Sequence, residues 1–132
     1  MGMVTPGDAA LPTRVLICED APGYGLLLEV SLVEAGMHVV ASAASWDEAV
    51  AGAAEHHPEL VLVDLWLPYR DDEALVALRA AAGDALVVAI SGLSAEEATD
   101  AIGALGVVDL ILSKRQSMSA LVAAIKEGLA RR

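Results

Sequence analysis

The chain has 132 residues, a length that suits one domain with a core of its own. Its net charge of −11 comes from 19 acidic and 8 basic residues, which argues against direct binding of nucleic acid, because such binding needs clustered Lys and Arg. No apolar run reaches the roughly 18 residues of a membrane span, and a single cysteine excludes an internal disulfide.

The first residues show no sign of a targeting segment. They lack the basic region and the apolar region of a signal peptide. We therefore expect residues 1–12 to be a flexible leader and residues 13–132 to form the domain. With neither a signal peptide nor a membrane span, the chain is predicted to be cytoplasmic.

Five short apolar runs predict β-strands. They do not alternate strictly between apolar and polar residues, which indicates strands buried on both faces of a sheet. The runs are 14–18, 37–43, 60–64, 86–90 and 108–112.

Helical stretches separate these runs. Two of them open with a capping box, beginning at Ser45 and Ser94. Gly36 and Gly83 predict the ends of the first and third helices. The predicted helices span residues 22–35, 72–82 and 118–130, with the second and fourth starting at their capping boxes.

Strict alternation of strand and helix predicts a parallel sheet with helices on both faces. Five such units suit an α/β, doubly wound (βα)5 flavodoxin-like fold, with five parallel strands in the order 2-1-3-4-5. In such sheets ligands bind beyond the carboxyl ends of the strands. The residues that follow each strand are therefore the candidates for a site.

Polar residues stand at four of these strand ends. Glu19 and Asp20 follow the first strand, Asp64 ends the third, Ser91 follows the fourth and Lys114 follows the fifth. Three carboxylates brought together repel one another and call for a cation. Oxygen ligands favour Mg2+ over zinc. The cluster is also expected to raise the pKa of one of its carboxyl groups when no metal is bound.

The motifs at these positions resemble the receiver domain of bacterial response regulators. The resemblance covers residue 14 to the end of the chain, and the motifs occur in the family's order. They are VLICED at 15–20, LVLVDLWLP at 60–68, VVAISG at 87–92 and LILSK at 110–114.

The resemblance implies a role for each residue at the metal site. Glu19 and Asp20 would be the acidic pair that holds Mg2+, with Asp20 as the direct ligand. Asp64 would be a third ligand, and the backbone carbonyl of Trp66 would complete the protein's share of the coordination.

The resemblance also implies roles in phosphoryl transfer. Asp64 would be the carboxylate nucleophile that accepts a phosphoryl group from a phosphohistidine. Lys114 would pair with a phosphoryl oxygen, and Ser91 would donate its hydroxyl to the phosphoryl group. The chemistry would extend no further than self-phosphorylation from small donors and self-dephosphorylation.

The implied function is that of a receiver in a two-component phosphorelay. Its partner would be a sensor histidine kinase or a phosphotransfer protein. Phosphorylation would switch the face formed by the fourth helix, the fifth strand and the fifth helix, through which members of the family often form homodimers. Whether the chain acts alone or belongs with an effector domain is left open.

The sequence departs from the family pattern at several positions. The family often has Tyr or Phe on the fifth strand, where this chain has Ile111 or, if the segment is one residue longer, Leu110. Asp72 replaces a frequent glycine, and Arg115 a frequent proline. The missing aromatic residue supports an alternative, a phosphorylation-independent protein-interaction module with a receiver-like fold.

Two large apolar residues stand where the family is thought to tune dephosphorylation. Trp66 lies two residues beyond Asp64, and Leu93 lies two residues beyond Ser91. We expect them to hinder the attacking water and to make the phosphoryl group long-lived.

Each of these residues also has a simpler interpretation, and similar folds have other functions. Asp64 could cap a turn, Glu19 and Asp20 could be a solvated turn, and Lys114 could be a surface cation. A flavodoxin is disfavoured because the acidic pair would repel the phosphate of FMN. A haloacid-dehalogenase-type phosphatase is disfavoured because Asp64 is not followed by the expected Asp-x-Asp pattern.

Overall fold

The computed structural model describes residues 11–93 and 95–132 of the chain. These residues form a sheet of five parallel strands in the order β2-β1-β3-β4-β5, as the alternation of strands and helices predicts. Residues 1–10 of the predicted leader lie outside the described residues. The strands are β1 Arg14–Cys18, β2 His38–Ala43, β3 Leu60–Asp64, β4 Leu86–Ser91 and β5 Leu110–Ser113.

The fifth strand begins two residues later than the apolar run predicts. Asp109, just before it, turns its carboxylate onto the backbone N–H of Val87 at 2.8 Å and onto Arg79 at 2.9 Å. The first pair of the β4–β5 ladder is therefore Val88 with Leu110. The strand therefore starts directly after this polar residue.

Capping determines where several helices begin. The hydroxyl of Ser45 accepts a hydrogen bond from the backbone N–H of Glu48, and the Glu48 carboxylate accepts one from the N–H of Ala44. Ser94, in the other predicted capping box, lies outside the described residues. Gly36 follows the first helix with a φ of +88°, a conformation that favours glycine. The helices are α1 Pro22–Glu34, α2 Trp46–His56, α3 Asp72–Ala82, α4 Ala95–Ile102 and α5 Met118–Ala130, with a short 3-10 helix at Gly103–Leu105.

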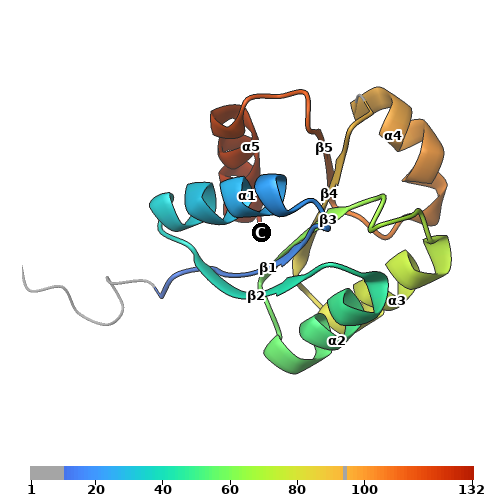
Figure 1. Cartoon of the computed structure of the whole chain (residues 1–132), viewed down its shortest axis with the longest axis horizontal. Coiled ribbons are helices and arrows are strands. Elements are labelled where there is room, and N and C mark those ends of the chain that lie inside the picture. The colour runs from blue at the N-terminus through green and yellow to red at the C-terminus, as the bar shows by residue number, and fades with distance from the viewer. Residues whose placement is uncertain (1–10, 94) are drawn as a thin grey trace, which may run out of the picture.

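The helices cover the sheet from both sides (Figure 1). One face packs on α1 and α5, through residues such as Ile17, Leu28 and Leu121. The opposite face packs on α2, α3 and α4, through residues such as Val63 and Leu75. Because helices cover both faces, β3 is buried along its whole length, including its last residue. Within the described residues, no helix is both long enough and apolar enough to cross a membrane.

Candidate functional site

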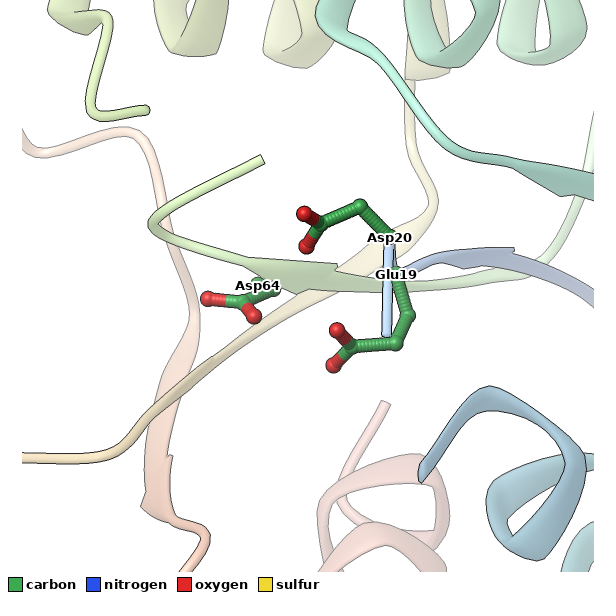
Figure 2. A group of neighbouring side chains, drawn as sticks. All are labelled: Glu19, Asp20 and Asp64. Atoms are coloured by element: carbon green, nitrogen blue, oxygen red, sulfur yellow. The ribbon is translucent and has the colours of Figure 1, made fainter. Parts of the chain in front are cut away.

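Three carboxylates meet at the carboxyl ends of two neighbouring strands. Glu19 and Asp20 follow β1, and Asp64 ends β3, which pairs with β1 in the middle of the sheet. Each side chain offers an oxygen, and the three oxygens lie within 4.8 Å of one another. Figure 2 shows the three side chains gathered at this end of the sheet. The predicted convergence of these residues is confirmed, whereas their roles stay predictions.

Asp64 is buried, and two groups hold its carboxylate in place. Its Oδ1 accepts a hydrogen bond of 2.8 Å from the backbone N–H of Trp66. Its Oδ2 accepts one of 2.8 Å from the ammonium of Lys114. An aspartate in an apolar strand would be costly without partners, and here both of its oxygens have one.

Glu19 contributes a second buried carboxylate. Its side chain is 2% exposed, and its oxygens contact the Lys114 ammonium at 2.7 Å and the N–H of Ala21 at 3.0 Å. Burial, together with the negative charge of Asp64, outweighs these contacts and raises the pKa of Glu19. Asp20, by contrast, is exposed at the mouth of the cluster.

Lys114 is the cation of the cluster. Partial burial lowers the pKa of its amine, but the hydrogen bonds to Asp64 and Glu19 outweigh that effect, so the pKa is raised overall. Its backbone N–H donates to the carbonyl of Ser91 at 2.7 Å, which fixes the end of β5 beside the end of β4. The ammonium is therefore held charged between two carboxylates.

Ser91 ends β4 and is fully buried. Its hydroxyl accepts a hydrogen bond of 3.1 Å from the N–H of Leu93. Among the described residues, no hydrogen bond joins the Ser91 hydroxyl to Asp64 or to Lys114. The structure places Ser91 at the same sheet end as the acidic cluster, on the strand next to Asp64.

The loop after β3 is tied to the domain by a tryptophan. The indole N–H of Trp46 donates to the carbonyl of Tyr69 at 2.6 Å. Asp71 then caps α3 by accepting a hydrogen bond from the N–H of Ala74. Asp72 is the first residue of α3 and has no positive φ, so its replacement of a frequent glycine brings no backbone strain.

The two candidates for the missing aromatic position point to different faces of the sheet. Ile111 packs with the cluster that contains Ala98 of α4, whereas Leu110 packs with the cluster beneath α1 and α5. Both are half-buried. The side chain of β5 that faces α4 is therefore aliphatic.

An aromatic residue from another element reaches the site instead. The ring of Tyr24, in the first turn of α1, lies 4.5 Å from the Lys114 ammonium, measured to the ring centroid. The sequence reasoning missed this residue. No motif marks it, because its contact with Lys114 depends on how α1 packs on the sheet.

Carboxylates of this kind suit a hard divalent cation. Three carboxylate oxygens from three side chains, two of them buried, form a set that prefers Mg2+ or Ca2+ to softer metals. One ammonium balances one of the three negative charges. The remaining negative charge would attract a cation. Because Asp20 is exposed, water could supply some of the ligands of that cation.

Comparison with known proteins identifies the family. Residues 15–126 match the response regulator receiver domain. The chain belongs to this family. The receiver domain is 32% identical over 130 residues to the transcriptional regulatory protein PdtaR of Mycobacterium tuberculosis, covering 98% of this chain and 63% of PdtaR. It thus spans less than two thirds of that relative.

Further similarities place the receiver domain among CheY-like proteins. It is 32% identical over 106 residues to the chemotaxis protein CheY of Bacillus subtilis, covering 79% of this chain and 88% of CheY. The receiver domain of NarL from M. tuberculosis has the same fold, with a TM-score of 0.80 at 22% identity, over 93% of this chain and all of that one. The receiver fold expected from the motifs is confirmed.

Proposed function

We propose that this receiver domain accepts a phosphoryl group on Asp64 within a two-component phosphorelay. The observation that carries the proposal is the position of its carboxylate, which ends a buried strand between an acidic pair and a fixed ammonium. A carboxylate oxygen of Asp64 would attack the phosphorus of a phosphohistidine. The P–N bond would break, the histidine nitrogen would keep the electron pair, and an acyl phosphate would form.

The other site residues would support this transfer electrostatically. Lys114, already 2.8 Å from Asp64, would pair with a phosphoryl oxygen as negative charge develops there. The hydroxyl of Ser91 currently accepts a hydrogen bond, and its own proton would be donated to the phosphoryl group. Together these contacts would draw the ends of β4 and β5 towards the phosphoryl group.

Mg2+ is the cation that the site would hold. Glu19, Asp20 and Asp64 would supply carboxylate oxygens, and Trp66 its backbone carbonyl. The N–H of Trp66 already bonds to Asp64, so the carbonyl of the same residue is kept near the cluster. When bound, the ion would neutralise the carboxylates and the incoming phosphoryl oxygens.

The donor would be a sensor histidine kinase or a phosphotransfer protein of the cytoplasm. Such a partner must bring its phosphohistidine to Asp64, next to the start of α1. That helix exposes several aliphatic side chains, which suits a protein contact. They are Leu26, Leu27, Val30 and Val33. The output would be a population shift in the face of α4, β5 and α5, including its use as a homodimer contact.

One experiment tests the phosphoacceptor directly. The purified protein is incubated with Mg2+ and acetyl phosphate, and its intact mass is measured. We expect a gain of about 80 Da for one phosphoryl group, absent without Mg2+ and absent in Asp64→Asn. Asp47→Asn, on the exposed first turn of α2, is the matched control and should gain the same mass.

The alternative, a phosphorylation-independent interaction module, rests on the aliphatic Ile111 on β5, whereas the convergence of the acidic cluster with Lys114 argues against it. Beryllofluoride, which mimics a phosphoryl group, separates the two functions. A change in oligomeric state or partner affinity would support the switch. No mass gain from acetyl phosphate or from a phosphorylated kinase, with no response to beryllofluoride, would favour the module.

A further inference from the structure

Tyr24 contacts the phosphoryl site although no motif of the sequence pointed to it. It is the third residue of α1, and its ring packs at the edge of the core cluster between α1, α5 and the sheet. The Lys114 ammonium lies 4.5 Å from the ring centroid. At this distance the ring attracts the cation through its negative face.

The ring of Tyr24, and not its hydroxyl, makes the contact with Lys114. The hydroxyl is buried, and no hydrogen-bond partner for it exists among the described residues. Such a hydroxyl is costly, and phenylalanine would pack the same ring without it. Burial is also the main cause that raises the pKa of Tyr24.

A metal ion bound at the site would compete for some contacts of Lys114 but not for others. Of the three described side chains that contact its ammonium, Glu19 and Asp64 are carboxylates that a bound cation would also use. The third, the ring of Tyr24, is neutral. A neutral ring holds the ammonium without competing for the metal ion and without repelling it.

We propose that Tyr24 is a positioning residue for phosphoryl transfer, holding the Lys114 ammonium beside Asp64 through a cation–π contact while the carboxylates bind the metal ion. This inference rests on the function proposed above. The aromatic residue near the site thus comes from α1, on the opposite face of the sheet from Ile111.

The test compares two substitutions of Tyr24. Tyr24→Leu removes the ring, whereas Tyr24→Phe keeps it and removes the hydroxyl. Phosphorylation by acetyl phosphate is followed by intact mass at saturating Mg2+, and the Mg2+ affinity is measured separately by tryptophan fluorescence. Tyr69→Leu, which removes the chain's other tyrosine, is the matched control because that side chain is exposed.

We expect Tyr24→Leu to slow phosphorylation about threefold to tenfold, the size of a partly buried cation–π contact. Tyr24→Phe and Tyr69→Leu should stay within about twofold of the wild type, and Mg2+ affinity should hardly change in any of them. In a Lys114→Met background, Tyr24→Leu should have no further effect. A purely structural role for the ring would slow both backgrounds alike.

Several outcomes would overturn the inference while leaving the proposed function intact. These are an unchanged rate in Tyr24→Leu, an equal loss in the Lys114→Met background, or a loss in Tyr24→Phe as large as in Tyr24→Leu. If the wild type is not phosphorylated by any donor, the proposed function itself fails. The ring-current shift of the Lys114 side-chain protons, present in wild type and Tyr24→Phe, checks the contact even if Tyr24→Leu does not fold.

Discussion

The ammonium of Lys114 and the carboxylate of Asp64 lie 2.8 Å apart, although 50 residues separate them along the chain. Lys114 also lies 2.7 Å from Glu19, so one cation serves two buried carboxylates. Parallel strands make this possible, because β1, β3 and β5 end at the same edge of the sheet. Among the described residues, the negative charge of these two carboxylates is therefore offset by the side chain of Lys114.

Removal of that cation should destabilise the metal-free protein. We expect Lys114→Met to lower the free energy of unfolding in EDTA by about 1–3 kcal/mol, because two buried carboxylates lose a charged partner. Mg2+ should stabilise the variant more than the wild type, since it restores positive charge. Urea unfolding with and without Mg2+ measures both effects. Lys126→Met, which replaces an exposed lysine of α5, is the control and should lower the free energy of unfolding much less.

The same lysine should make stability depend on alkaline pH. Its pKa is raised in the folded protein, so the stability that it contributes is present below the ordinary value of 10.5 and is lost as the pH rises through the raised value. Unfolding of wild type and Lys114→Met from pH 8 upward should therefore give curves that converge at high pH. Curves that stay parallel would contradict this assignment.

Mg2+ binding should weaken on acidification because protons compete for Glu19. Its pKa is raised above the ordinary value of 4.5, mainly by burial, so the carboxylate proposed as a metal ligand becomes protonated at a higher pH than an ordinary glutamate. We expect the affinity to fall by up to about tenfold per pH unit below that raised pKa. A fluorescence titration from pH 8 to pH 4.5 measures it. Glu19→Gln should bind Mg2+ more weakly, with a flatter dependence on pH.

Much of this architecture follows from sequence patterns. Apolar runs without alternation predict a sheet covered on both faces, and the rule that ligands bind at carboxyl ends of parallel strands brings Asp64 and Lys114 together. A one-residue error in a strand boundary does not change which end of the sheet a residue occupies. The convergence of the site was therefore predictable, even though β5 starts later than its apolar run.

What the sequence did not predict are contacts between side chains far apart in the chain. The ring of Tyr24 against Lys114 depends on how α1 crosses the sheet. The carboxylate of Asp109 binds Arg79, 30 residues away. No periodicity encodes such pairs, because each depends on the packing of two elements, and a tyrosine or an arginine on a helix has many other places to lie.

The contacts of the Asp109 carboxylate should stabilise the fold, independently of the candidate site. Its carboxylate joins α3 and β4 to the start of β5 through Arg79 and the N–H of Val87. We expect Asp109→Ala to lower the free energy of unfolding by about 1–3 kcal/mol, because the buried N–H loses its acceptor. Asp100→Ala, at an exposed position of α4, should cost less than half as much. An equal loss in the two variants would contradict the anchoring role.

The lifetime of the phosphoryl group should depend on Trp66 and Leu93. The backbone N–H of Trp66 bonds to Asp64 and that of Leu93 bonds to Ser91, so both apolar side chains start from residues fixed to the site. Trp66 is 50% exposed, and we expect its side chain to cover a phosphoryl group on Asp64 from the solvent side. Each side chain would then hinder the approach of water to the phosphorus.

We therefore expect Trp66→Ala and Leu93→Ala each to shorten the half-life of the phosphorylated protein roughly tenfold, a change of about 1.4 kcal/mol in the barrier. Decay of the added mass after removal of acetyl phosphate, in the presence of Mg2+, measures it. Val76→Ala, at an exposed position of α3, is the control and should leave the half-life unchanged. A wild-type half-life of seconds would rule out this shielding, because neither side chain would then be slowing the attack of water.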